Sequence, residues 1–211
     1  MISRMQDLIR SVWIRTRLRG TAFADRYAQL ESAYRAEDPW SMSSPREQFR
    51  FSATSRICRD WIGPRLPNLL EIGSGEGHQT LHWLDLSDEV YGLELSDRAI
   101  QRARTRCPMA KFAQNQDGRI NLAPGWPTRF RLVALCEVAY YSSDPEGLIE
   151  SAERLGESCV ISYFEPRSGR LDPIMARIPL VGQETIEFEQ TRWVVAWWNS
   201  RYLGQVSTER T

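Results

Sequence analysis

Short apolar runs alternate with amphipathic segments over most of the chain after residue 67. The apolar runs predict strands at 68–72, 89–95, 110–114, 130–138 and 158–164. Helices are predicted between them, one ending at Leu84 and two covering 97–106 and 145–155, with Ser96 as the cap of the second. Strands that alternate with helices indicate a parallel sheet covered on both faces.

The last two strands differ from the others in their polarity. Only residue 191 separates the segments 185–190 and 192–200, which predicts an antiparallel hairpin. Ile186 and Phe188 alternate with Glu187 and Glu189, as in an edge strand, whereas 193–198 is apolar on both faces. We therefore expect an α/β, Rossmann-like, seven-stranded and mostly parallel sheet, with antiparallel strand 7 inserted between strands 5 and 6.

The chain of 211 residues has no Pro/Gly/Ser-rich linker, so one globular unit is expected. We assign 1–66 to an N-terminal helical extension and possible lid, and 67–211 to the ligand-binding domain. Five arginines and regularly spaced apolar residues in the first twenty positions predict an amphipathic helix. A transit peptide and a membrane-surface helix are alternatives to an ordinary packing helix, and no apolar run is long enough for a membrane span.

Composition narrows the classes of partner. The 27 basic and 27 acidic residues balance, so nucleic acid and membrane surfaces are not expected partners. The four cysteines form no C-x-x-C pair, which favours reduced core thiols in a cytoplasmic protein. His78 and His82 would share a helix face, but no H-E-x-x-H pattern surrounds them and no metal site is predicted.

The stretch LLEIGSGEGHQT, residues 69–80, places a glycine turn after the first strand. Such a turn lets a ligand approach the backbone, and ligands of doubly wound sheets bind at the carboxyl ends of the strands. His78 stands where the dinucleotide fingerprint has its third glycine. Glu94 ends the second strand, where a carboxylate accepts hydrogen bonds from ribose hydroxyls of either NAD or S-adenosylmethionine.

Three segments together resemble the class I S-adenosylmethionine-dependent methyltransferases: LLEIGSGEGHQT, VYGLELSDRAIQRAR and FRLVALCEVAYY, in the family's order and spacing. The inserted last strand is also a mark of that family. CEVAYYSSDPEGL and EDPWSMSSPREQFRFSAT are further similar to segments of the nodulation-factor N-methyltransferases. Arg46 departs from that pattern, because those relatives often have Tyr there.

The resemblance implies S-adenosylmethionine as cofactor and S-adenosylhomocysteine as product. The glycines would accommodate the methionyl and ribose portions, Glu71 would help hold the ammonium, and Glu94 would bind the ribose hydroxyls. Gln116 or Asp117 would meet the adenine. The expected cofactor-binding set is Glu71, Gly73, Ser74, Gly75, Gly77, Glu94, Leu95, Gln116, Asp117 and Glu137.

The expected catalytic residues follow the fourth strand. Glu137 is the candidate base, with orientation of the cofactor or capping of the next helix as the alternative. Tyr140 and Tyr141 would line the acceptor pocket or hydrogen-bond the nucleophile. A lid over the cofactor is expected from four residues before the first strand, with surface packing as its alternative: Trp40, Glu47, Arg50 and Phe51.

These residues predict a small-molecule methyltransferase acting on nitrogen or oxygen. The relatives suggest an amino sugar or glycan-derived acceptor, and 167–182 is short for an insertion that would wrap a large polymer. A nicotinamide oxidoreductase is the alternative, disfavoured by His78 and by the absence of a Tyr-x-x-x-Lys pair, since Lys111 is the only lysine. A non-catalytic cofactor-binding protein is the second alternative, and a monomer or homodimer is expected.

Overall fold

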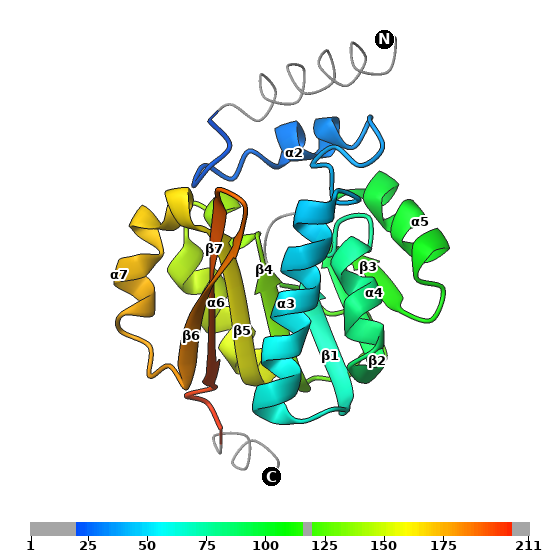
Figure 1. Ribbon diagram of the computed structural model, residues 1–211. Coiled ribbons are helices and arrows are strands. Elements are labelled where there is room, and N and C mark those ends of the chain that lie inside the picture. Colours follow the sequence, from blue (N-terminus) through cyan, green and yellow to red (C-terminus); the bar gives the residue numbers. More distant parts are fainter. Residues whose placement is uncertain (1–19, 116–119, 204–211) are drawn as a thin grey trace.

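A mixed seven-stranded sheet forms the centre of the computed structural model, which describes residues 20–115 and 120–203 (Figure 1). Its strands lie in the order β3-β2-β1-β4-β5-β7-β6. The strands are β1 Leu66–Ile72, β2 Ser87–Glu94, β3 Lys111–Gln114, β4 Phe130–Cys136, β5 Gly156–Phe164, β6 Gly182–Phe188 and β7 Thr191–Asn199. The helices are α2 Tyr27–Ala33, α3 Pro45–Ile62, α4 His78–Leu84, α5 Asp97–Arg106, α6 Pro145–Leu155 and α7 Asp172–Met175, with short 3-10 helices η1 Ala139–Tyr141 and η2 Glu165–Arg170.

Local caps define the helices that the sequence predicted. The helices α5 and α6 have the predicted bounds. The Ser96 hydroxyl accepts from the Ala99 backbone nitrogen at 3.3 Å, and the Asp144 carboxylate accepts from the Gly147 nitrogen at 2.9 Å. The amphipathic helix was predicted in the first twenty residues, of which 1–19 lie outside the described residues.

The fourth strand is shorter than the sequence predicted. β4 ends at Cys136, two residues before the predicted end at 138, because Glu137 has a φ of 58° and turns the chain away from the sheet. The backbone nitrogen of Glu137 still donates to the Ser162 carbonyl on β5 at 2.8 Å. The turn points the Glu137 region into the space beyond the sheet, where a ligand of this fold binds.

The predicted insertion of the last strand is confirmed. β7 pairs antiparallel with β5, with Ile161 opposite Ala196, and also with β6, where Ile186 lies opposite Trp193. Trp193 and Trp198 are both buried, whereas β6 alternates exposed and covered positions at the edge. A strand with apolar side chains on both faces needs other parts of the protein to cover both faces. The position of β7 between β5 and β6 provides that cover.

Helices cover the two faces of the sheet in separate groups (Figure 1). Side chains of α3, α4 and α5 join one apolar cluster, represented by Ile57, Trp83 and Ile100. Those of α6 and α7 join the other, represented by Ile149 and Met175. Within the described residues, no helix is long and apolar enough to cross a membrane.

Residues 21–44, here called the cover, lie across the carboxyl ends of the parallel strands with α2 above the sheet (Figure 1). The Phe23 nitrogen donates to the Tyr140 carbonyl at 2.8 Å, and the Asp25 nitrogen donates to the Tyr141 carbonyl at 3.3 Å. The cover is therefore attached to the chain segment that follows β4.

Candidate functional site

One cavity of about 470 Å³ lies beneath the cover at the carboxyl ends of β1, β2 and β4. Most of the predicted site residues in the described chain line it: Glu71, Gly73, Ser74, Gly75, Glu94, Leu95, Glu137, Tyr140 and Tyr141. Gly77 is not among the lining residues, and Gln116 and Asp117 lie outside the described residues. The cavity therefore brings together residues from three strand ends that are far apart in the sequence.

The glycines of the turn have different neighbours. A Cβ on Gly73 would lie 2.7 Å from Val138 Cγ2, so only a glycine lets the two loops lie this close beside the cavity. A Cβ on Gly77 would lie 3.2 Å from both the Cα and the Cβ of Ala103 on α5. In this structure Gly77 therefore permits packing of the turn against a helix, and its expected contact with a cofactor has no support from its position.

Glu94 is buried at the end of β2 with its carboxylate toward the glycine turn. It accepts hydrogen bonds from the Gly75 nitrogen at 2.9 Å and the Ser96 nitrogen at 3.0 Å. Burial raises the pKa of Glu94 to about 7, although these backbone donors favour the charged form. Near neutral pH this carboxyl therefore changes its charge easily when a ligand brings new donors.

Glu71 is a second buried carboxyl of the cavity, at the end of β1. It accepts from the Thr80 hydroxyl at 2.5 Å. Burial raises the pKa of Glu71 to about 8, while the Thr80 hydrogen bond and the charge of Arg50 act in the opposite direction. No ion pair holds Glu71 or Glu94 among the described residues, so both carboxyls are open to a cationic ligand.

Asn115, which the predicted set omitted, is the residue after β3 that lines the cavity. The residue is 8% exposed, and its Oδ1 has no hydrogen-bond partner in the described part of the chain. The neighbouring Gln114 is exposed, and its amide donates to the Leu95 carbonyl at 2.9 Å. A buried carbonyl oxygen without a donor is costly, which marks Asn115 as an acceptor for a ligand N–H group.

Glu137 lies at the opposite side of the cavity, where β4 ends. The Tyr140 hydroxyl donates to Glu137 Oε2 at 2.8 Å, and the Ser162 hydroxyl donates to Oε1 at 3.3 Å. Burial raises the pKa of Glu137, and the charge of Arg50 and the Tyr140 hydrogen bond limit that rise. The non-glycine φ of 58° at this residue is the kind of backbone strain that accumulates at functional sites.

Arg50 is a buried cation of the cavity, contributed by α3. Its side chain is 2% exposed, its Nε donates to Glu47 Oε2 at 2.9 Å and its Nη1 donates to Gln79 Oε1 at 3.4 Å. All four residues expected to form a lid line the cavity: Trp40, Glu47, Arg50 and Phe51. Whether the cover opens and closes stays a prediction.

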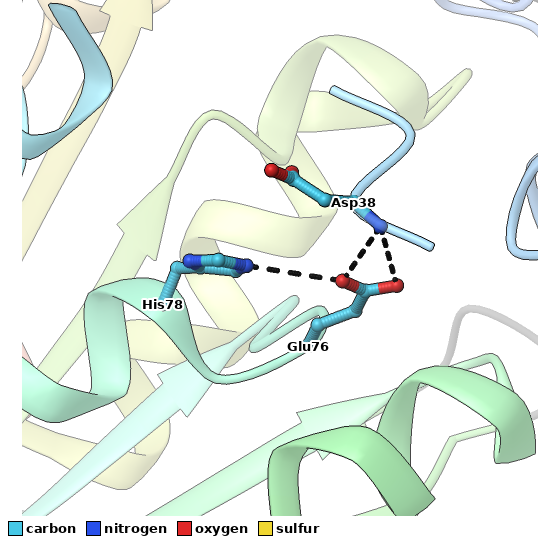
Figure 2. A group of neighbouring side chains, drawn as sticks. All are labelled: Asp38, Glu76 and His78. Atoms are coloured by element: carbon cyan, nitrogen blue, oxygen red, sulfur yellow. Dashed lines mark hydrogen bonds and ion pairs between the residues drawn. The ribbon is translucent and has the colours of Figure 1, made fainter. Parts of the chain in front are cut away.

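The cover is fastened to the glycine turn through Glu76. Figure 2 shows the Asp38 backbone nitrogen facing the Glu76 carboxylate, which it reaches at 3.1 Å and 2.9 Å, while the Asp38 carboxylate points away. Arg102 on α5 pairs with Glu76 and also donates to the carbonyls of Ala36 at 2.9 Å and Tyr34 at 3.1 Å. We call Glu76 and Arg102 the latch.

Asp38, Glu76 and His78 have potential metal-ligating atoms within 4.8 Å of one another (Figure 2). The arrangement does not favour a divalent ion, because the guanidinium of Arg102 already neutralises Glu76. The Asp38 carboxylate also accepts from the Ser43 nitrogen at 3.0 Å. His82, the other histidine, instead lies 3.4 Å from Gln48 Oε1.

Comparisons with known proteins agree with this architecture. Residues 70–158 match the family model of a methyltransferase domain. The N-methyltransferase NodS from Bradyrhizobium japonicum WM9, solved with S-adenosylhomocysteine, has a similar structure, with a TM-score of 0.70 and 20% identity over 83% of this chain and 98% of that one. The N-terminal domain of EvdMO1, solved with S-adenosylhomocysteine and D-fucose, matches with a TM-score of 0.55 and 15% identity over 72% of this chain and 85% of that one.

A protein-L-isoaspartate O-methyltransferase from Hahella chejuensis is 24% identical over 154 residues, which are 71% of this chain and 66% of that relative. At such low identities, structural similarity shows only a common fold. The domain match is a match of sequence, and it includes the glycine turn and the strands around it. The recognition of the family from its motifs is thereby confirmed. Residues 70–158 are a methyltransferase domain, and the chain has the fold of the solved N-methyltransferase NodS.

Proposed function

We propose that the protein transfers a methyl group from S-adenosylmethionine to a nitrogen or oxygen nucleophile of a small molecule, such as an amino sugar or another glycan-derived acceptor. The observation that carries this proposal is the hydrogen-bonded Glu137 on the wall of the cavity that also contains Glu94 and Asn115. NodS is named as an N-methyltransferase and the Hahella chejuensis relative as an O-methyltransferase, so the comparisons leave both nucleophiles open.

The buried polar atoms fit an adenosyl ligand. Glu94 has the charge and the position to accept from two ribose hydroxyls, as it now accepts from two backbone nitrogens. Asn115 Oδ1 and Ser74 Oγ are both buried without hydrogen-bond partners among the described residues, and the adenine amino group would give the first of them a donor. Glu71 would face the ammonium group, and a bound cation would return its pKa toward the usual range.

S-adenosylmethionine, when bound, supplies a methyl group activated by a sulfonium sulfur. The protein then has to hold the acceptor atom roughly 3 to 3.5 Å from that carbon and in line with the sulfur. Glu137 would remove a proton from the acceptor, so that a free lone pair forms the new bond to carbon while the carbon–sulfur pair stays on sulfur. The raised pKa of Glu137 suits a base that works near neutral pH.

The cover would exclude water from this reaction. Tyr34 and Trp40 pack with ring centroids 4.8 Å apart, and the Tyr34 hydroxyl lies 3.1 Å from the place where a Cβ on Gly75 would be. We therefore expect residues 21–44 to move when a ligand as large as the cofactor enters or leaves. The latch would set how often this happens.

The four cysteines are free and buried, which suits the reducing cytoplasm that we expect for this protein. A monomer or homodimer remains our expectation for its assembly.

Calorimetric titration of the purified protein with S-adenosylmethionine, S-adenosylhomocysteine and NADH tests the proposed cofactor. We expect binding of both adenosyl ligands and no heat from NADH. Tight NADH binding without adenosyl binding would support a nicotinamide oxidoreductase and refute the proposal. Adenosyl binding without methyl transfer to amino sugars, sugars or small amines would instead favour a non-catalytic binding protein.

Glu94→Gln should weaken S-adenosylhomocysteine binding at pH 8 by about 1.5 to 3 kcal/mol, because hydrogen bonds to a charged acceptor are lost. The wild-type protein must release a proton from Glu94 before the carboxylate can accept two hydroxyls, so its affinity should fall as pH drops below about 7. The variant should lack this pH dependence. Glu89→Gln is the matched control, because Glu89 is exposed on the same strand and pairs with Lys111. Unchanged affinity in Glu94→Gln would show that the ribose site lies elsewhere.

Arg102→Leu should raise the dissociation rate of S-adenosylhomocysteine severalfold, because the cover loses the hydrogen bonds from Arg102 to the carbonyls of Ala36 and Tyr34. Stopped-flow displacement measures this rate. Arg65→Leu is the control, since Arg65 pairs with the exposed Asp88 away from the cover. An equal dissociation rate in the wild type and Arg102→Leu would argue against a gating role.

Glu137→Gln should lower kcat by about a hundredfold or more while leaving S-adenosylhomocysteine affinity within a few fold, since a general base acts in the transition state. Glu157→Gln, a surface change at the opposite end of β5, should leave both values unchanged. A loss of affinity with retained kcat would reassign Glu137 to cofactor binding.

A further inference from the structure

Arg167 on η2 lines the cavity without an acidic partner. Its Nη1 is buried and has no hydrogen-bond partner, and no ion pair involves it in the part of the chain that the structure describes. Glu165, the nearest acid along the chain, instead pairs with Arg192 at 3.2 Å. Arg170 of the same turn donates to the Ser143 carbonyl at 3.0 Å. Arg167 therefore differs from Glu165 and Arg170, because its buried Nη1 has no acceptor among the described residues.

Arg167 and the proposed base, Glu137, both contact Tyr140. Its guanidinium carbon lies 5.1 Å from the centroid of the Tyr140 ring, and the hydroxyl of the same Tyr140 donates to Glu137 at 2.8 Å. The guanidinium and the carboxylate therefore contact one tyrosine side chain, one over its ring and one at its hydroxyl. A ligand group at Arg167 would lie within a small molecule's length of an atom at Glu137.

Sheet topology separates Arg167 from the proposed cofactor residues. Asn115 follows β3, Glu94 ends β2 and the glycine turn follows β1, whereas Glu137 follows β4 and Arg167 follows β5. In the strand order β3-β2-β1-β4-β5, the groups proposed for adenine, ribose and methionine precede the base, and Arg167 comes after it. With the cofactor bound as proposed, the guanidinium would therefore lie on the acceptor side of Glu137.

The other arginines of the cavity already have an acidic partner. Arg50 pairs with Glu47 at 2.9 Å, and Arg46 pairs with the same carboxylate at 2.9 Å. The cation–π contact with Tyr140 offsets part of the desolvation of Arg167, but it leaves the N–H donors in the plane of the guanidinium without an acceptor among the described residues. A planar guanidinium with free donors matches a carboxylate or a phosphate group, which it can bind with two parallel hydrogen bonds.

We propose that Arg167 is the acceptor-recognition residue of this site and that the natural acceptor carries an anionic group, a carboxylate or a phosphate, in addition to the nucleophile methylated beside Glu137. This proposal rests on the proposed function. It narrows the acceptor from any small amine or sugar to an acidic one.

Radiolabelled methyl transfer to three related probes tests the proposal: glucosamine, glucosamine 6-phosphate and glucosaminuronic acid. For the wild type we expect the phosphate or the carboxylate probe to have a KM at least about tenfold below that of glucosamine. The acidic probe with the lower KM identifies the anionic group. Equal KM values for all three probes would overturn the proposal.

Arg167→Gln should raise the KM of the preferred acidic probe by about tenfold to a hundredfold, with kcat for glucosamine and the affinity for S-adenosylhomocysteine unchanged. Arg167→Lys should recover part of the effect, because it keeps a charge but not the fork of donors. Arg170→Gln is the matched control on the same turn. A parallel rise in KM for glucosamine and the acidic probe would indicate a structural role and refute the assignment.

Calorimetry separates failure of this proposal from failure of the proposed function. If no probe is methylated, titration of glucosamine 6-phosphate and glucosaminuronic acid into the complex with S-adenosylhomocysteine still measures recognition. Binding of an acidic probe that Arg167→Gln weakens would support the anion site even without turnover. Absence of such binding, or equal binding to both proteins, would contradict it.

Discussion

The arrangement of this site depends on three carboxyl groups that are removed from water without an ion-pair partner in the described chain: Glu71 and Glu94, which are buried, and Glu137, which is half-buried. Removing a carboxylate from water disfavours its charge, and for each of the three this effect raises the pKa. Backbone nitrogens and hydroxyl groups keep the carboxyls satisfied in the free protein. A ligand with an ammonium and a sulfonium charge would bring cations to these carboxyls, which gives a physical reason for the fit of the cavity to S-adenosylmethionine.

The sheet orders these groups in space. Parallel strands bring their carboxyl ends to one edge, so the residues at or just after these ends lie in a row, from Asn115 beyond β3 to Arg167 beyond β5. The antiparallel β7 does not interrupt this series, because it lies on the far side of β5 and adds its core tryptophans there. The cover then closes the edge through the latch, which joins residues 34–38 to the turn after β1 and to α5.

Much of the fold was predictable because the patterns that encode it are local. Ser96 and Asp144 cap helices whose bounds were predicted correctly, and the two-sided apolar run at 193–198 predicted the interior position of β7. The glycine turn and the glutamate that ends the second strand likewise indicated a nucleoside ligand from their spacing alone. The end of β4 was predicted two residues too late, since an apolar pattern does not show that Glu137 adopts a left-handed backbone.

The sequence by itself determined the class of fold, the methyltransferase domain of residues 70–158 and the carboxylates available for the site. Only the tertiary structure decided that Asn115 faces the cavity, that Gly77 packs on α5, that Glu76 fastens the cover and that Arg167 has no acidic partner among the described residues. The physical reason is that the residues in these contacts are far apart in the sequence. Hydrophobic periodicity predicts which face of a helix or strand is buried. A contact between residues 38 and 76 depends instead on how segments distant in the sequence pack together.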